Sequence, residues 1–231
     1  MSEIANDEIN VTTIEDPVEY VFPRITQIQI NEPAGVTFAA GLRSILRQDP
    51  DAILVGEIRD IETARIATQA ALTGHFVLSS LHATDSVSAL HRFIDMGIEL
   101  FLIASSLLGV VGQRLIRKNC PHCFEPYTPS ADELGFYVRA LGDEATEKLE
   151  WFHGAGCNFC GDTGYLGRVG IYEVLKITDE MKALIVQSAA HEEIRSLAIS
   201  QGLFTLREQA LRLVAEDVTT VSEVLRTVYV L

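Results

Sequence analysis

The sequence predicts an α/β fold in which short buried strands and helices alternate around a parallel sheet. Three observations support this prediction. Short apolar runs rich in β-branched residues, such as 9–14 and 53–55, end abruptly in glycine or acidic residues. Segments with apolar side chains at helical spacing separate most of these runs. With 231 residues and 48% hydrophobic content, the chain can also bury a substantial core.

Apolar or β-branched runs that are bounded by turn residues predict the strands. They lie at 9–14, 20–30, 53–55, 75–82, 112–117 and 171–175. Pro17 stops the first run, and the second alternates so loosely that it fits either a strand or a hairpin arm. The alternation of strands with helices along the first half of the chain indicates a doubly wound core.

Apolar side chains spaced three and four residues apart predict the helices. They lie at 37–48, 61–72, 86–96, 98–109, 130–149, 179–188, 191–201, 206–216 and 220–230. Thr37, Thr178, Thr205 and Thr220 are suited to cap the N-termini of four of them. We interpret the helices after residue 178 as a C-terminal appendage, because they contain no catalytic constellation.

The charge and hydropathy of the chain argue against several classes of protein. Its formal net charge is −14, whereas a nucleic-acid-binding domain normally carries a basic face. Residues 1–8 are acidic and lack the apolar centre of a signal peptide. The longest apolar run, 100–111, is too short to cross a bilayer. We therefore expect a cytoplasmic protein that does not bind nucleic acid and whose cysteines are not in stable disulfides.

Several predicted strands end in side chains that are capable of chemistry. Glu15 and Asp16 follow the first strand, Glu57 follows the third, and His82 follows the fourth. An open α/β sheet binds its ligands at the carboxyl ends of its strands. If the first and third strands are neighbours, one glutamate could orient water and the other could hold a metal ion. The alternative is that these are ordinary acidic turns.

Basic residues near these strands are candidates for contacting a phosphate. His82 stands at the end of the strand predicted at 75–82, where it could sense a γ-phosphate, and His75 stands at the start of the same strand. Arg43 and Arg47 lie four residues apart and share one helix face. The two arginines could reach a nucleotide, including one held by a neighbouring subunit. The alternatives are a structural role for the histidines and a solvated face for the arginines.

Two C-x-x-C pairs predict a structural zinc site. The pairs are Cys120 with Cys123 and Cys157 with Cys160. Two such knuckles can supply the four thiolates of a tetrahedral site, which has no open coordination position for catalysis. A thioredoxin-like redox function is less well supported, because it needs only one pair.

Taken together, these motifs resemble the secretion ATPase superfamily, in its type II secretion and type IV pilus assembly branch. Residues 15–20 (Glu-Asp-Pro-Val-Glu-Tyr) look like the aspartate box of that superfamily. Residues 46–60 resemble its Walker B region, and residues 73–85 resemble its histidine box. The paired cysteines resemble its zinc element, and retraction motors generally lack this element. The resemblance covers nearly the whole chain.

The resemblance implies a RecA-like P-loop NTPase core and a hexameric motor that hydrolyses ATP with Mg²⁺. Its expected partner is an inner-membrane platform protein, so the chain would be peripheral to the inner face of the plasma membrane. The implied catalytic residues are Glu15, Glu57 and His82. The implied nucleotide-binding residues are Asp16, Glu19, Arg43, Arg47, Arg59 and His75. The implied zinc ligands are Cys120, Cys123, Cys157 and Cys160.

One departure from the family pattern is the lack of a G-x-x-x-x-G-K-[ST] phosphate loop. We therefore expect the chain to be the C-terminal portion of a longer motor. It would contain a partial ATPase core (1–117), a zinc element (118–175) and a helical subdomain (176–231). The alternative is a non-catalytic, zinc-stabilised module that binds full-length motor subunits. A nucleic-acid-binding zinc ribbon is disfavoured by the negative charge.

Overall fold

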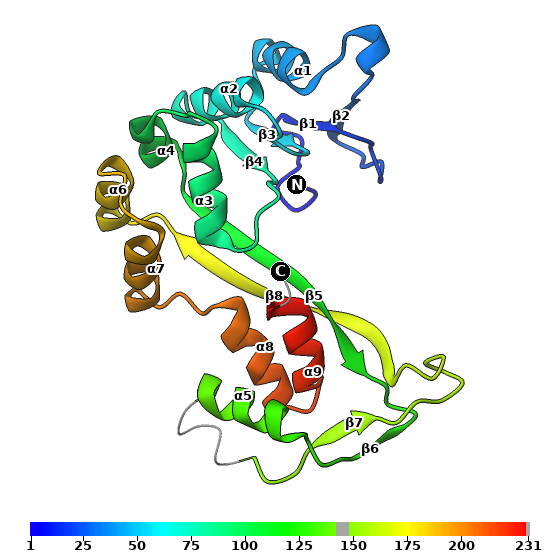
Figure 1. Cartoon of the computed structure of the whole chain (residues 1–231). Helices are drawn as coiled ribbons and strands as arrows, with labels where there is room; N and C mark the ends of the chain where they lie inside the picture. The colour runs from blue at the N-terminus through cyan, green and yellow to red at the C-terminus, as the bar shows by residue number, and fades with distance from the viewer. Residues whose placement is uncertain (142–147, 230–231) are drawn as a thin grey trace. The chain divides into compact units, whose positions relative to one another are not determined.

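The computed structural model describes residues 1–141 and 148–229 (Figure 1). The chain forms two compact units, and each draws on three separate segments. Unit 1 contains Met1–Ala83, Val87–Val110 and Lys176–Leu197. Unit 2 contains Thr84–Ser86, Val111–Leu175 and the chain from Ala198 onward. No helix within the described ranges is both long and apolar enough to cross a membrane.

Unit 1 is built on a parallel sheet of four strands (Figure 1). Their order across the sheet is β2 (Ile25–Gln29), β1 (Val11–Glu15), β3 (Ala52–Val55) and β4 (Phe76–Ser79). The predicted parallel sheet is therefore confirmed. The segment over 20–30 is not a hairpin arm, because β2 runs parallel to β1 rather than turning back along it. The neighbouring positions of β1 and β3 bring their carboxyl ends to one edge of the sheet.

The helices of unit 1 follow the predicted periodicity closely. They are α1 (Phe38–Ile45), α2 (Ile61–Leu72), α3 (Ser86–Asp95), α4 (Leu100–Ser106), α6 (Asp179–Val186) and α7 (His191–Ser200), with short 3₁₀ turns at Glu32–Ala34 and Leu46–Gln48. Thr37 Oγ1 accepts a hydrogen bond from Ala40 N at 3.2 Å, as predicted for an N-cap. Buried side chains from strands and helices, including Ile14, Leu42 and Ile53, form the core.

Unit 2 consists of two small sheets and several helices. Strand β5 (Gly109–Asn119) pairs with β8 (Tyr165–Lys176), and β6 (Phe124–Pro126) pairs antiparallel with β7 (Phe152–Gly154). The helices are α5 (Ala131–Leu141), α8 (Leu206–Ala215) and α9 (Val221–Val224), and a π-helical turn over Leu225–Tyr229 follows α9. The remainder of the helix predicted over 130–149 lies largely outside the described residues. The strand predicted at 112–117 exists but pairs with β8, so it does not extend a doubly wound sheet.

The C-terminal helices contribute to the cores of both units. Helix α6 and most of α7 belong to unit 1. Side chains of α8 and α9, including Leu211 and Val224, pack with Ile116, Tyr137 and Trp151 in the core of unit 2. The rings of Tyr137 and Trp151 meet edge to face, with centroids 4.8 Å apart. Burial of this apolar surface stabilises unit 2.

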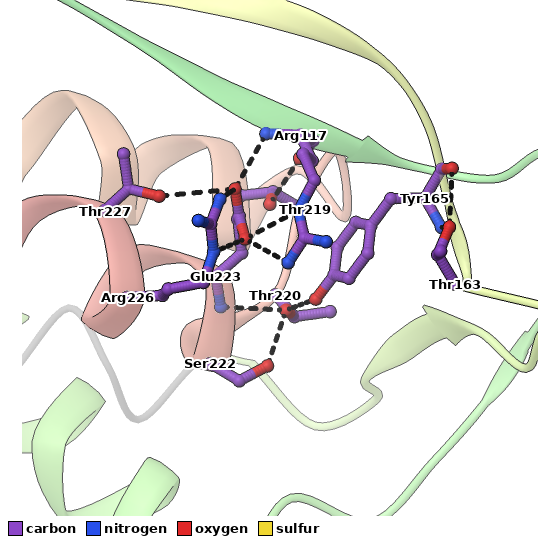
Figure 2. A network of polar contacts seen from close by, with 9 residues as sticks. All are labelled: Arg117, Thr163, Tyr165, Thr219, Thr220, Ser222, Glu223, Arg226 and Thr227. Atoms are coloured by element: carbon purple, nitrogen blue, oxygen red, sulfur yellow. Dashed lines mark hydrogen bonds and ion pairs between the residues drawn. The ribbon is translucent and has the colours of Figure 1, made fainter.

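A buried glutamate joins α9 to β5 in unit 2 (Figure 2). The Glu223 side chain is fully buried and accepts hydrogen bonds from the backbone N–H and guanidinium of Arg117 at 2.7–3.0 Å. Arg226 donates two more at 2.7 and 2.8 Å, and Thr227 donates one at 3.2 Å. Burial raises the pKa of Glu223, but these donors outweigh it and lower the pKa to about 2. We call this group of residues the Glu223 cluster.

Candidate functional site

The carboxyl ends of β1, β3 and β4 line one pocket in unit 1, with a volume of about 360 Å³. We call it the acidic pocket. Its lining residues are Glu15, Asp16, Pro17, Glu19, Tyr20, Phe22, Phe38, Leu54, Gly56, Glu57, Ser80 and His82. The structure thus brings together the acidic strand ends and the histidine that sequence analysis selected separately. This is the position at which open parallel sheets bind ligands.

Gly56 allows Glu57 to reach this pocket. Gly56 N donates a hydrogen bond to Ile14 O at 2.8 Å, so β3 passes very close to the end of β1. A Cβ atom at position 56 would lie only 3.1 Å from Ile14 O and 3.3 Å from the Cα of Glu15. Both neighbours are backbone atoms that cannot move aside easily. The glycine therefore sets the close spacing of Glu15 and Glu57.

The Glu57 carboxylate has one satisfied oxygen and one unsatisfied oxygen. Arg59 forms an ion pair with Oε1, while His82 Nε2 lies 3.3 Å from Oε2. Oε2 is nevertheless buried and has no hydrogen-bond partner among the described residues. The Arg59 hydrogen bond and positive charge lower the pKa of Glu57, against the opposing effect of burial. Glu57 is thus a charged carboxylate with one oxygen available to a cation or a water molecule.

Glu15 is held by two side chains that the sequence analysis did not select. Thr13 Oγ1 donates to Glu15 Oε1 at 2.6 Å, and Gln27 Nε2 donates to the same oxygen at 3.0 Å. Thr13 precedes Glu15 by two residues on one strand, a spacing that places both side chains on one face. Gln27 is the register partner of Thr13 across the β1–β2 pair, and the sequence does not reveal that pairing.

The acidic pocket fits a single Mg²⁺ ion whose coordination shell is completed by oxygen atoms from another ligand. Carboxylate oxygens are the ligands this ion prefers, and Glu57 Oε2 is a buried oxygen without a hydrogen bond. Arg59 Nη1 also lies 3.9 Å from Asp16 Oδ2, so the guanidinium lies near both carboxylates. Among the described residues, only the cysteines form a ready group of three or more close ligand atoms. Magnesium sites that use one or two carboxylates are usually completed by water and phosphate oxygens.

Three of the predicted nucleotide contacts are not brought to this pocket within one chain. His75 precedes β4, at the end of the strand opposite His82, and its Nδ1 lies 3.0 Å from Ala70 O and 3.1 Å from Thr73 Oγ1. Arg43 forms an ion pair with Glu62. Arg47 Nη2 donates to Ser44 Oγ at 3.2 Å. None of the three lines the acidic pocket.

The four cysteines of unit 2 form a tight group of sulfur atoms. All four Sγ atoms lie within 4.8 Å of one another. The Sγ–Sγ distances include 3.9 Å for Cys120–Cys157, 3.9 Å for Cys123–Cys160 and 3.7 Å for Cys157–Cys160. Four sulfurs at about 2.3 Å from a tetrahedral zinc ion would be separated by about 3.8 Å. The spacing therefore fits the four-thiolate zinc site that the C-x-x-C pairs predict.

Backbone N–H groups around the cysteines donate hydrogen bonds to two of the four sulfur atoms. Gly156 N donates to Cys123 Sγ at 3.3 Å, while Cys157 N and Gly164 N donate to Cys160 Sγ at 3.2 and 3.3 Å. Burial raises the pKa of Cys160, but the two N–H donors outweigh it and lower the pKa to about 6. For Cys123, burial dominates and raises the pKa to about 12. Sulfurs this close repel each other when ionised, and a bound dication would offset that repulsion.

Comparison with known proteins places nearly the whole chain in one family. The family described as "Type II/IV secretion system protein" matches residues 1–226. The type IV pilus assembly ATPase PilB of Thermus thermophilus is 46% identical over 227 residues, which cover 97% of this chain and 25% of that protein. The type II secretion system ATPase E of Vibrio cholerae is 45% identical over 226 residues, which cover 98% of this chain and 44% of that protein. The chain thus spans a quarter to less than half the length of these relatives.

Solved structures show the same fold. The pilus retraction motor PilT with bound ADP matches with a TM-score of 0.66 and 25% identity, over 94% of this chain and 52% of that chain. The ATPase DotB of Legionella pneumophila matches with a TM-score of 0.64 over 95% of this chain and 51% of that chain. At 21% identity, the likeness to DotB concerns the fold alone.

Proposed function

Because the chain belongs to the type II/IV secretion system protein family, we propose that it is part of an ATP-hydrolysing motor subunit that powers type II secretion or type IV pilus assembly. The observation that carries this proposal is the convergence of Glu15, Asp16, Glu57 and His82 on the acidic pocket. Phosphoryl transfer needs positioned acids, a cation and a group that contacts the γ-phosphate.

Four side chains in or beside the acidic pocket have contacts that support a role in hydrolysis. Bound Mg²⁺ would neutralise phosphate charge, and Glu57 is suited to its coordination shell because Oε2 has no competing hydrogen bond. Glu15, held by Thr13 and Gln27, is suited to orient the attacking water. The two acids could also exchange these roles. His82 lies next to Glu57 and would contact the γ-phosphate, while Arg59 would balance the charge of Glu57 and Asp16.

We propose that the phosphate-binding loop is supplied by sequence outside these 231 residues. The chain has four lysines, Lys118, Lys148, Lys176 and Lys182, and none lies in a G-x-x-x-x-G-K-[ST] motif. It also covers only 25–44% of the length of the relatives described above. The acidic pocket would then form one wall of the nucleotide site, and the glycine-rich loop would form the other.

Arg43, Arg47 and His75 could contact nucleotide only from a neighbouring subunit, because they do not reach the pocket of their own chain. Arg43 and Glu62 are both about half exposed, so this arginine can change partners at an interface. We propose a homohexamer on this basis and on the family membership. Its partner would be a platform protein at the inner face of the plasma membrane. We also propose that residues 118–175 form a zinc element whose four thiolates have a structural role.

Calorimetric titration with ATP and Mg²⁺ tests the proposed function. It should be carried out on this chain and on the longest protein that its gene encodes. We expect only a protein that includes a phosphate loop to bind and hydrolyse ATP. Glu57→Gln should then abolish turnover and retain binding. Wild-type turnover in Glu57→Gln would overturn the assignment of the acidic pocket as the hydrolytic site.

The lack of a phosphate loop in these residues favours one alternative function. The chain could be a non-catalytic module that binds full-length motor subunits and is stabilised by zinc. In that case, neither protein would bind nucleotide, and this chain would co-purify with a motor subunit. Co-purification that is lost on Arg43→Ala and Arg47→Ala, together with no nucleotide binding, would support the alternative.

A further inference from the structure

The loop that joins β1 to β2 forms one wall of the acidic pocket. It covers residues 16–24, and several of its side chains, including those of Asp16 and Glu19, line the pocket. Side-chain packing holds this loop weakly, because Tyr20 is 71% exposed and Val21 is 86% exposed. The position of the loop therefore depends on its hydrogen bonds.

One side chain of β2, that of Gln27, holds this loop at two points. Its Nε2 donates to Tyr20 O at 2.9 Å, and its Oε1 accepts a hydrogen bond from Phe22 N at 2.8 Å. The other glutamine of β2, Gln29, makes a longer contact, in which Val18 N donates to its Oε1 at 3.3 Å. Gln27 is thus the stronger of the two anchors.

The same amide group also holds the carboxylate of Glu15. Gln27 Nε2 donates to Glu15 Oε1 at 3.0 Å, and Thr13 Oγ1 donates to the same oxygen at 2.6 Å. Neither of these donors uses Oε2, so the second oxygen of Glu15 can accept from a water molecule. Gln27 therefore contacts both the end of β1 and the loop that follows it.

The chemistry of the primary amide suits position 27. Such a group presents two N–H donors on one side and a carbonyl acceptor on the other. Gln27 uses all of them, because its two donors face Glu15 Oε1 and Tyr20 O while its oxygen faces the N–H of Phe22. A glutamate of the same size would turn an acceptor toward Tyr20 O and would place a second carboxylate beside Glu15, where the two charges repel.

We infer that Gln27 is a positioning residue that fixes Glu15 and the 16–24 loop in one arrangement. Because a single amide binds both, displacement of the loop moves Glu15, and the water that Glu15 orients moves with it. All of these residues belong to unit 1. This inference rests on the proposed role of Glu15 in hydrolysis.

Turnover of the full-length protein tests the inference. We expect Gln27→Ala to lower kcat about tenfold and to change KM little, because the misplaced group acts in the chemical step. Gln27→Glu, which keeps the size of the side chain, should lower kcat further because it repels Glu15. In a Glu15→Gln background, Gln27→Ala should lower kcat by less than about twofold, because the two residues act as one unit.

Gln29→Ala is the matched control, because it removes the same type of side chain from the same strand and its hydrogen bond goes to Val18 rather than to Glu15. Its kcat should stay within about twofold of wild type. With Glu57→Gln inactive, the inference is wrong if Gln27→Glu keeps full kcat, if Gln29→Ala loses as much as Gln27→Ala, or if the effects of Gln27→Ala and Glu15→Gln are additive. If Glu57→Gln keeps full turnover, the proposed function itself has failed, and the inference fails with it.

Nuclear magnetic resonance of the Gln27 side-chain amide on this chain gives a readout that is independent of activity. Both Nε2 protons should exchange with solvent more slowly than those of Gln29, because each is bonded to an acceptor. Glu15→Ala should shift one of the two proton resonances toward that of a free amide and leave the other, bonded to Tyr20 O, nearly unchanged. Equal exchange at the two glutamines, or no response to Glu15→Ala, would overturn the inference.

Discussion

The acidic pocket and the Glu223 cluster each pair a glutamate with arginine, yet the two glutamates differ in how many hydrogen bonds they accept. Glu223 is fully buried, and both of its oxygens accept several hydrogen bonds (Figure 2). Glu57 is 14% exposed, with one oxygen paired to Arg59 and the other left without a hydrogen bond. In both cases the pKa is lowered, so both side chains are charged.

The difference shows how a structural carboxylate can be told from a reactive one in this fold. A carboxylate such as Glu223, whose two oxygens accept several hydrogen bonds each, has no lone pair left for a ligand, and removing its charge takes away the partner of two arginines. A carboxylate at the edge of a pocket that has an oxygen without a hydrogen bond carries a local energetic cost, which a bound cation or water could remove. The predictions below test whether unit 2 is structural and unit 1 is chemical, from the largest expected effect to the smallest.

Removal of zinc should have the largest effect and should be confined to unit 2. We expect the purified chain to contain about one zinc per chain, and a strong chelator to unfold unit 2, because thiolates without a cation repel each other. Trp151, the only tryptophan, is 8% exposed in the core of unit 2, so its fluorescence should shift to that of an exposed indole. Unchanged fluorescence after zinc is removed would show that the cysteine group is not needed for folding.

Glu57→Gln should have the next largest effect, and it should act on turnover alone. We expect ATP hydrolysis by the full-length protein to fall about 10²- to 10⁴-fold, because the carboxylate that holds a cation or water is lost. The midpoint of thermal unfolding should change little, because the side chain makes few contacts. Glu62→Gln, on the exposed surface of α2, is a matched control that should retain turnover. A large loss of stability in Glu57→Gln would place Glu57 with the structural carboxylates.

Glu223→Gln should give the opposite result. We expect a loss of about 3 kcal/mol in the free energy of unfolding of unit 2, because the donors that surround this buried carboxylate lose their charged partner. Urea unfolding followed by Trp151 fluorescence measures this loss. Turnover per folded molecule should remain at the wild-type level. A stable variant would mean that Arg117 and Arg226 are satisfied by solvent when the charge is removed.

Acid should weaken unit 2 through the same glutamate. The pKa of Glu223 is about 2 in the folded protein, compared with 4.5 for an unperturbed glutamate. Because the folded pKa is the lower of the two, the charged form of Glu223 stabilises the folded protein. This contribution to the free energy of unfolding is fully present above about pH 4.5 and is lost as the pH falls toward 2. We expect a loss of about 2 kcal/mol by pH 3, measured as a fall in the urea midpoint. In Glu223→Gln, this part of the pH dependence should disappear.

Arg43→Ala should have the smallest effect on the isolated chain. Arg43 and Glu62 form an ion pair with both side chains about half exposed, so we expect a change of less than about 1 kcal/mol in stability. If the arginine acts across a subunit interface, turnover of the assembled motor should fall although stability does not. Equal turnover in mutant and wild-type assemblies would remove Arg43 from the nucleotide site.

The helices and the parallel strands were predictable because local chemistry specifies them. Helix α2 begins and ends where its apolar spacing predicted, since Asp60 caps its first turn by accepting from Thr63 N at 2.8 Å. Strands β6 and β7 were missed, because three residues are too few to show a period. The pairing of β5 with β8 was also missed, because alternation identifies a strand but not its partner.

The site was predictable to the extent that strand ends determine it. Glu15, Glu57 and His82 all follow strands, and they meet because parallel strands end at one edge. His75 was grouped with them by motif, yet it precedes β4 and so lies at the opposite end of that strand from His82. The contacts of Glu15 with Gln27 and of Arg59 with Asp16 depend on register and side-chain orientation, which no local pattern encodes.

The repeated passage of the chain between the two units limits how this protein can be divided. The chain changes unit after Ala83, Ser86, Val110, Leu175 and Leu197, so neither unit is encoded by one continuous stretch of the gene. A protease that cuts near residue 117 or 175 would leave both units without some of their core. Exchange of gene segments between relatives could not transplant one unit alone. The two units are therefore expected to be synthesised, inherited and degraded together.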